Sequence, residues 1–195
     1  MVTVPPPPAV PRPVTVVVAA VLAFLHVAVV LVGLMGLLVV LGRMSLLAPG
    51  RLDTGTLVGV LGTGVLAVFR AYGGWSGGRP FLKADNAISA AFSGFMWLQV
   101  LVGLGLYFGL SPWGLNGLKQ YGMKDPTARF FGVEHIAVML LAAVLAQVGR
   151  LAVKRAPEML KHRKALIYFG VALVLVLLMI PWGIWNPARP MGRGL

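Results

Sequence analysis

The feature that most constrains this chain is a series of long apolar runs. Each run approaches or exceeds the roughly 20 apolar residues that a helix needs to cross a bilayer. They cover residues 14–41, 56–71, 86–110, 130–148 and 166–184. Only 11% of the residues are charged, whereas a soluble domain has about a quarter. The sequence therefore predicts an all-α membrane bundle with five transmembrane helices.

The basic residues between these runs predict an orientation. The net charge is +12, but lysine and arginine lie in short loops beside apolar runs, which favours membrane topology over nucleic-acid binding. The N-terminal side of the membrane would hold ten of them, six within residues 150–164, and the opposite side seven. Because basic loops stay on the cytoplasmic side, the N-terminus is expected inside.

Composition also excludes several chemistries. The chain has no cysteine, which rules out disulfides, thiolate-ligated zinc, iron–sulfur clusters and covalent haem attachment. Its five acidic residues leave little material for hydrolysis, cation transport or a proton relay. We therefore predict no catalytic residues and no metal site, and a small membrane transporter is the least favoured alternative.

The expected domain organisation follows the same pattern. Residues 1–13 form a proline-rich tail of extended conformation. Residues 14–42 form an added transmembrane helix, since the run is too long for a signal-peptide core. A four-helix membrane bundle covers residues 52–185, and a C-terminal tail covers residues 186–195.

Small residues four positions apart predict where the helices pack. Such pairs let two backbones approach closely within a membrane. The candidate packing residues are Gly55, Gly59, Ala87, Ala91, Ala142 and Ala146.

His135 is the candidate functional residue. With Glu134 it begins the run at 130–148, and ionisable residues inside a membrane are usually functional. The leading interpretation is a hydrogen bond to a neighbouring helix. The expected partners are Gln99, Asp53 or a loop carbonyl, and a haem ligand or a quinone contact is the alternative. Glu134 is expected to pair with Arg129 or another basic loop residue.

The other two histidines are weaker candidates. His26 lies in the first run, and its depth should differ from that of His135 by roughly 10 Å. One haem iron would not easily bridge the two. His162 lies in the sequence Lys-His-Arg-Lys, which predicts a solvated basic loop.

Four motifs carry a resemblance to a known family. They are Phe69-Arg70-Ala71-Tyr72-x-Gly74-Trp75-x-Gly77-x-Arg79-Pro80-Phe81-x-Lys83-x-Asp85, Leu98-Gln99-x-Leu101-x-Gly103-Leu104-x-Leu106-Tyr107-Phe108, Arg129-Phe130-Phe131-Gly132-x-Glu134-His135 and Ile180-Pro181-Trp182. Together, over about residues 52–185, they resemble small four-helix bacterial membrane proteins labelled cytochrome b-like. The family pattern has histidines at two positions where this chain has Asp53 and Trp97. Of the three family histidine positions considered, only position 135 has a histidine in this chain.

The resemblance implies a place in bacterial electron transfer. We expect a non-catalytic accessory subunit of a respiratory or photosynthetic complex in the bacterial inner membrane, whose partners are other membrane subunits and lipids. The alternative is an electron carrier that binds haem b through His135 and an unusual or partner-supplied second ligand.

Overall fold

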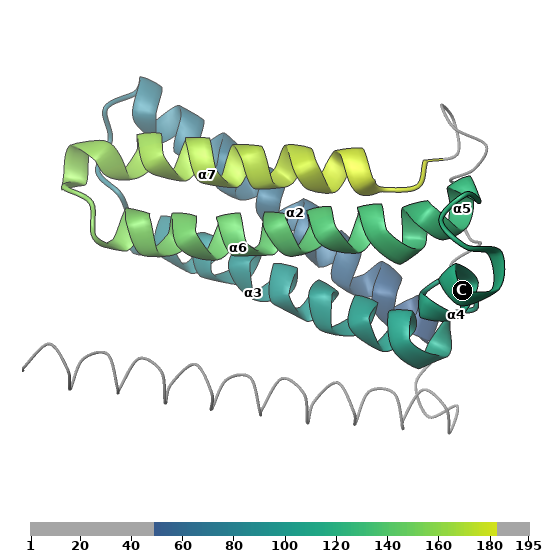
Figure 1. The fold of residues 1–195 in the computed structure, drawn as a ribbon. Coiled ribbons are helices and arrows are strands. Elements are labelled where there is room, and N and C mark those ends of the chain that lie inside the picture. Colours follow the sequence, from purple (N-terminus) through teal and green to yellow (C-terminus); the bar gives the residue numbers. More distant parts are fainter. Residues whose placement is uncertain (1–48, 183–195) are drawn as a thin grey trace, which may run out of the picture.

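The computed structural model describes residues 49–182, and all regular structure within that range is helical (Figure 1). The elements are α2 (Pro49–Ser76), α3 (Lys83–Gly105), η1 (Leu106–Leu110), α4 (Leu115–Tyr121), α5 (Pro126–Arg129), η2 (Phe130–Glu134), α6 (His135–Lys154) and α7 (Glu158–Met179). The elements η1 and η2 are single π-helical segments that continue α3 and precede α6. The expected span at 14–41 and both terminal tails lie outside the described residues.

The four long helices form a ring in which each packs against two neighbours. Helix α2 lies against α3 and α7, and α6 lies against α7 and α3. Residues 77–82 and 155–157 connect helices at one end, which we call the short-loop end. Residues 106–134 and 179–182 lie at the opposite end, which we call the capped end (Figure 1).

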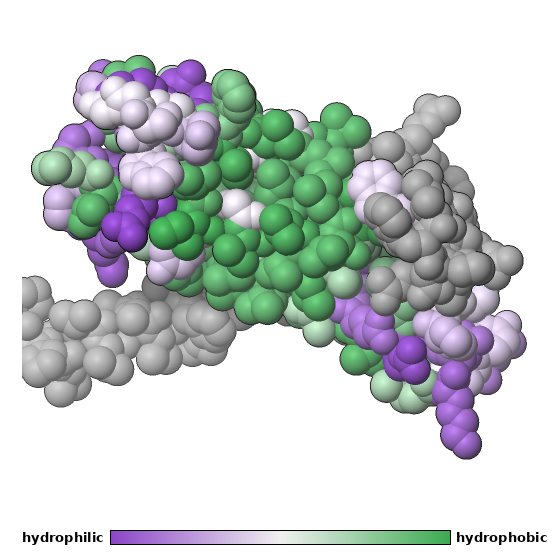
Figure 2. All heavy atoms as spheres, turned by 90° about the horizontal axis from the view of Figure 1, so that it is seen from above, coloured by the Kyte–Doolittle hydropathy of each residue, from purple (hydrophilic) through white to green (hydrophobic). Residues whose placement is uncertain are grey.

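The outer surface of the bundle has the character of a membrane-facing surface. Four helices are long and apolar enough to cross a bilayer, over Gly55–Ser76, Lys83–Gly109, Pro126–Lys154 and Glu158–Met179. Figure 2 shows an apolar belt between two hydrophilic ends. Large apolar side chains such as Val65, Leu141 and Val174 point outward. The chain is therefore a helical, multi-pass membrane protein.

Small and aromatic residues alternate in the core. Phe92 and Phe169 meet edge to face, with ring centroids 5.7 Å apart, and both are fully buried. Gly64 makes room for the Phe92 ring, since a Cβ there would lie 2.8 Å from it. Fully buried Ala142 and Ala146 let α6 approach its neighbours.

The helices extend beyond the apolar runs that predict them. Helix α2 continues to Ser76, α6 to Lys154, and α7 begins at Glu158. The predicted basic loop at 150–164 is therefore wrong, because only residues 155–157 separate the two helices. Hydropathy marks the hydrocarbon layer, whereas backbone hydrogen bonds continue a helix into the headgroup region. Helix α7 ends at Met179, two residues before Pro181.

The long connection at the capped end is structured and contains the short helices α4 and α5. Asp125 caps α5 by accepting a 2.7 Å hydrogen bond from the Ala128 amide, with Pro126 in the first helical position. Gly114 lies directly on the Tyr107 backbone, where a Cβ would approach the Tyr107 carbonyl oxygen to 2.5 Å. The connection therefore covers the ends of α3 and α6.

Candidate functional site

The main polar cluster of the bundle begins with the turn after α2. Gly78 has φ +63°, and the Arg79 amide donates to the Gly74 carbonyl over 3.2 Å. This is a glycine-terminated helix end, which needs a left-handed residue at that position. The turn directs Arg79 back toward α2, where its Nη2 donates to the Arg70 carbonyl over 3.1 Å.

Asp85, in the first turn of α3, accepts from three groups. Arg70 Nε donates over 2.8 Å, and Arg79 donates through Nη1 and Nη2 over 2.7 and 2.9 Å. The Leu82 amide adds a fourth hydrogen bond of 2.8 Å. Because the Asp85 side chain is only 4% exposed, the carboxylate depends on these partners for the hydrogen bonds that water would otherwise provide.

The cluster holds one net positive charge on its three ionised side chains. Arg70 and Arg79 remain about one-third exposed while they bind Asp85. The hydrogen bonds from Arg79 to Asp85 raise the pKa of the Arg79 guanidinium. The cluster fastens the loop at 77–82 to both α2 and α3.

His162 completes this end of the bundle from α7. It is 4% exposed, and its Nε2 lies 3.4 Å from the Pro80 carbonyl oxygen. Its ring lies 5.0 Å from the Phe81 ring. The backbone of Gly74 lies against the same imidazole, since a Cβ there would be 2.2 Å from Cε1. His162 Nδ1 is buried without a hydrogen-bond partner in the described part of the chain.

The prediction of a solvated His162 is therefore wrong. Lys161 and Arg163 beside it suggest a loop, but the helix turns position 162 inward. The spacing of apolar residues along α7 could have predicted that His162 is buried, because the buried positions of this helix include 162, 165, 169, 172 and 176. Those three- and four-residue steps mark one helical face, and residue 162 extends it by one turn.

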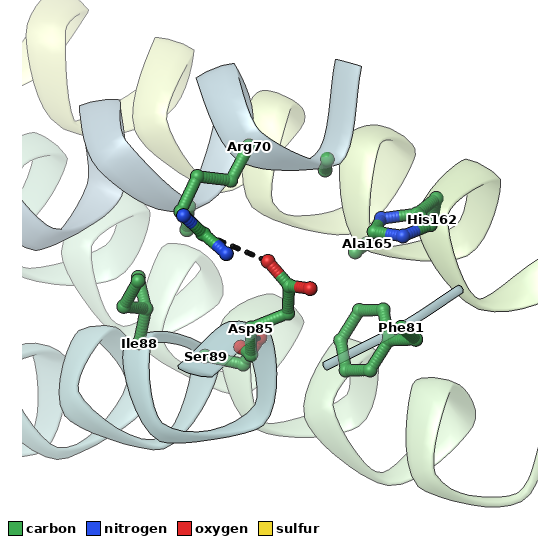
Figure 3. Close-up of a pocket in the computed structure, with 9 residues that line it drawn as sticks. Arg70, Phe81, Asp85, Ile88, Ser89, His162 and Ala165 are labelled. Atoms are coloured by element: carbon green, nitrogen blue, oxygen red, sulfur yellow. Dashed lines mark hydrogen bonds and ion pairs between the residues drawn. The ribbon is translucent and has the colours of Figure 1, made fainter. Parts of the chain in front are cut away.

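A small hollow lies between Asp85 and His162. Its lining includes the polar residues Arg70, Asp85, Ser89 and His162 and the apolar residues Ala67, Ala71, Phe81, Ile88 and Ala165. Figure 3 shows Asp85 and His162 approaching this hollow from different helices.

His135 lies at the capped end, and it is partly buried. Its Nδ1 donates to the Met179 carbonyl oxygen over 3.0 Å. Met179 is the last residue of α7, where carbonyls lose their helical partners. The Trp182 indole donates to the Leu177 carbonyl over 2.9 Å, so two side chains cap the end of α7. One partner of His135 is thus the final carbonyl of a helix. Of the expected partners, Gln99 accepts a hydrogen bond from Thr56, and the side chain of Asp53 lies outside the described residues.

Aromatic rings surround His135, and its neighbour Glu134 forms an ion pair. The Phe130 and Phe131 centroids lie 5.7 and 6.3 Å from the imidazole centroid. Arg129 Nε lies 2.9 Å from Glu134 Oε1, the pair expected from the sequence. Both of these side chains are at least one-third exposed, so their pairing adds little stability.

Two polar contacts inside the bundle join α3 to its neighbours. Thr56 donates to Gln99 between α2 and α3. Ser93 donates to Gln147 Oε1 over 2.6 Å between α3 and α6. Interhelical hydrogen bonds of this kind stabilise membrane bundles modestly.

The six candidate packing residues fall into two groups. Gly59 lies against Phe95, where a Cβ would approach Cδ1 to 2.5 Å, and Ala142 and Ala146 are fully buried. Gly55 and Ala87 are exposed and Ala91 is partly buried, so Ala87 and Ala91 do not form a tightly buried contact within the described bundle.

The described residues do not supply a two-histidine haem site. His135 contacts the C-terminal residue of α7, whereas His162 lies seventeen positions earlier on that helix. At 1.5 Å per residue the two are about 25 Å apart. Among the side chains that the structure describes, no group of three His, Cys, Asp or Glu residues is arranged to hold a metal ion.

Fold and site together define a multi-pass helical membrane protein with an ion-pair cluster at one end and a histidine helix cap at the other. No protein-family model matches the chain, and comparisons with curated proteins and with solved structures find no match either.

Proposed function

We propose that this chain is a non-catalytic accessory subunit of a bacterial electron-transfer complex in the inner membrane. The electron-transfer setting rests on the motif resemblance over residues 52–185. The accessory role rests on how the described polar side chains are used. Asp85 is saturated by arginines, and His135 caps a helix. Each has a structural task at a helix end, which supports a packing subunit.

The observation that carries this proposal is a row of small residues on the outside of α3. Ala87, Ala91 and Gly94 follow one another at steps of four and three, which places them on one helical face. A Cβ at Gly94 would meet nothing within 4 Å. Small residues on membrane helices let another helix approach closely. This face would bind a partner subunit, and the expected span at 14–41 would provide a second attachment.

The test is association in native membranes. Gly94→Leu adds a large side chain on the proposed face, at a position where a Cβ meets nothing in the described bundle. We expect it to leave the melting temperature unchanged and to abolish co-purification of partner subunits. Gly170→Leu on α7 is the matched control, because a Cβ there also meets nothing within 4 Å. Unchanged co-purification in Gly94→Leu would contradict the proposed interface.

Deletion of residues 1–45 tests the second attachment. We expect a folded bundle that separates from its assembly during purification. If the truncated protein still co-purifies with every partner, the first span has no docking role.

One contact favours the alternative, a cytochrome b-like electron carrier. The Met179 carbonyl can only accept, so it fixes the proton of a neutral His135 on Nδ1. Metal-bound histidines commonly donate their second nitrogen to a carbonyl in this way. A reduced-minus-oxidised spectrum of the protein, alone and in its complex, decides between the two roles. A Soret band that His135→Ala removes would establish the carrier.

A further inference from the structure

We propose that the hollow between Asp85 and His162 is a binding site for one structural water molecule, which joins α3 to α7 at the short-loop end. The argument begins with His162 Nδ1. This nitrogen is buried and has no partner within the described residues. Buried polar atoms are nearly always hydrogen-bonded, to protein or to ordered water.

The geometry of the ring defines what Nδ1 needs. The Pro80 carbonyl near Nε2 can only accept, so the proton of a neutral imidazole lies on Nε2. Nδ1 then carries a lone pair and requires a donor. In the described structure Phe81 and Gly74 lie against the ring, and neither brings a side-chain donor.

The hollow has about the volume of one water molecule. A buried water needs two to four polar partners. Arg70, Asp85 and Ser89 line it together with His162. Because both Asp85 carboxylate oxygens already accept two hydrogen bonds, a water could donate one hydrogen to His162 Nδ1 and the other to the Ser89 hydroxyl oxygen, whose own hydrogen is donated to the Asp85 backbone carbonyl.

The charges around the hollow favour water over an ion. Arg70 and Arg79 already neutralise Asp85 and leave one positive charge, which repels a cation. An anion would face the Asp85 carboxylate and the lone pair of Nδ1. A neutral molecule that both donates and accepts fits this lining.

The first test compares two side chains of nearly equal shape in the hollow. Ala165, 2% exposed, lines it from α7. Threonine adds a hydroxyl that can replace the water, whereas valine fills the same space without a donor. We expect Ala165→Thr to melt at or above the temperature of Ala165→Val in the full-length protein. In a His162→Phe background, which removes the acceptor, the order should reverse.

This cycle cancels any bond that the threonine hydroxyl makes to its own helix, because that bond is the same in both backgrounds. We expect the threonine–valine difference to change by about 2 °C or more between backgrounds, which corresponds to roughly 1 kcal/mol for a protein of this size. A difference independent of His162 would overturn the proposal.

The second test observes the water directly. The full-length protein with ¹⁵N-labelled histidine is reconstituted in lipid nanodiscs, and His162→Phe identifies the His162 signals. We expect the ¹⁵N chemical shift of Nδ1 to be that of a nitrogen that accepts a hydrogen bond. We also expect magnetisation transfer from water protons to the His162 ring. A non-bonded Nδ1 without a water contact would show that the hollow is dry and overturn the proposal.

Discussion

At the scale of single residues, His135 is a helix cap, and its removal should cost stability. In His135→Ala the Met179 carbonyl loses its side-chain donor, and orphaning such a partly buried group costs about 1–3 kcal/mol. His135→Asn, which can still donate, should recover part of the loss. Unfolding by denaturant in detergent micelles measures both variants. Equal stability of His135→Ala and the parent chain would contradict the capping role.

Substitution of Asp85 should also lower the free energy of unfolding. Asp85→Ala removes a carboxylate whose side chain is only 4% exposed, and it leaves Arg70 and Arg79 without their acceptor. Breaking a buried pair costs about 3–5 kcal/mol, and the one-third exposure of both arginines reduces this to about 2 kcal/mol.

Glu158→Ala is the matched control for Asp85→Ala. Glu158 also bonds a backbone amide, that of Phe81, and a basic side chain, Lys161. However, its side chain is 51% exposed, so water can replace these partners and the change should be small. The two variants are compared by thermal unfolding. A larger loss in Glu158→Ala would show that burial does not control the strength of these pairs.

Individual contacts were harder to predict from sequence than helices. The motif resemblance included Arg70, Arg79 and Asp85, but their meeting depends on the turn at Gly78 that brings Arg79 back over α2. The hydrogen bond of His135 was anticipated, yet its acceptor depends on the residue at which α7 ends. Such contacts join residues up to 82 positions apart, which no local pattern encodes.

At the scale of elements, the contact between α6 and α7 depends on one glycine. A Cβ at Gly149 would lie 2.4 Å from Tyr168 Cβ. We expect Gly149→Ala to separate the helices and lower the melting temperature, although alanine has the better helix propensity. Gly170→Ala, with nothing within 4 Å of its Cβ, should be neutral or stabilising. Equal responses of the two variants would show that propensity, rather than packing, controls this pair.

The number of membrane-spanning helices within residues 49–182 follows from the sequence, because a span requires a long apolar run and nothing else resembles one. Which small residues face inward does not follow. Ala142 and Ala87 each have an alanine four positions further on, yet one is fully buried and the other exposed. The four-residue spacing identifies a face, but the direction of that face depends on helices elsewhere in the chain.

At the scale of the whole molecule, the two ends carry different charge. Within residues 49–182 the short-loop end has nine basic residues and the capped end has four. Those at the short-loop end are Arg70, Arg79, Lys83, Arg150, Lys154, Arg155, Lys161, Arg163 and Lys164. Those at the capped end are Arg51, Lys119, Lys124 and Arg129. The excess predicts that the short-loop end lies in the cytoplasm.

Cysteine labelling checks this orientation, since the natural chain has no cysteine. Gln120→Cys at the capped end and Pro157→Cys at the short-loop end both replace exposed residues. A membrane-impermeant reagent should label Gln120→Cys in intact cells and Pro157→Cys only after permeabilisation. Labelling of both from the same side would refute the arrangement of the bundle in the membrane, and the reverse pattern would refute its orientation.

The close approach of Gly74 to His162 has a consequence for how this chain can evolve. Any side chain at position 74 would enter the space of the imidazole, where a Cβ would lie 2.4 Å from both ring nitrogens. A substitution at 74 therefore requires a smaller residue at 162, although 88 positions separate them. In homologous sequences we expect the two positions to covary, with larger residues at 74 found beside smaller residues at 162.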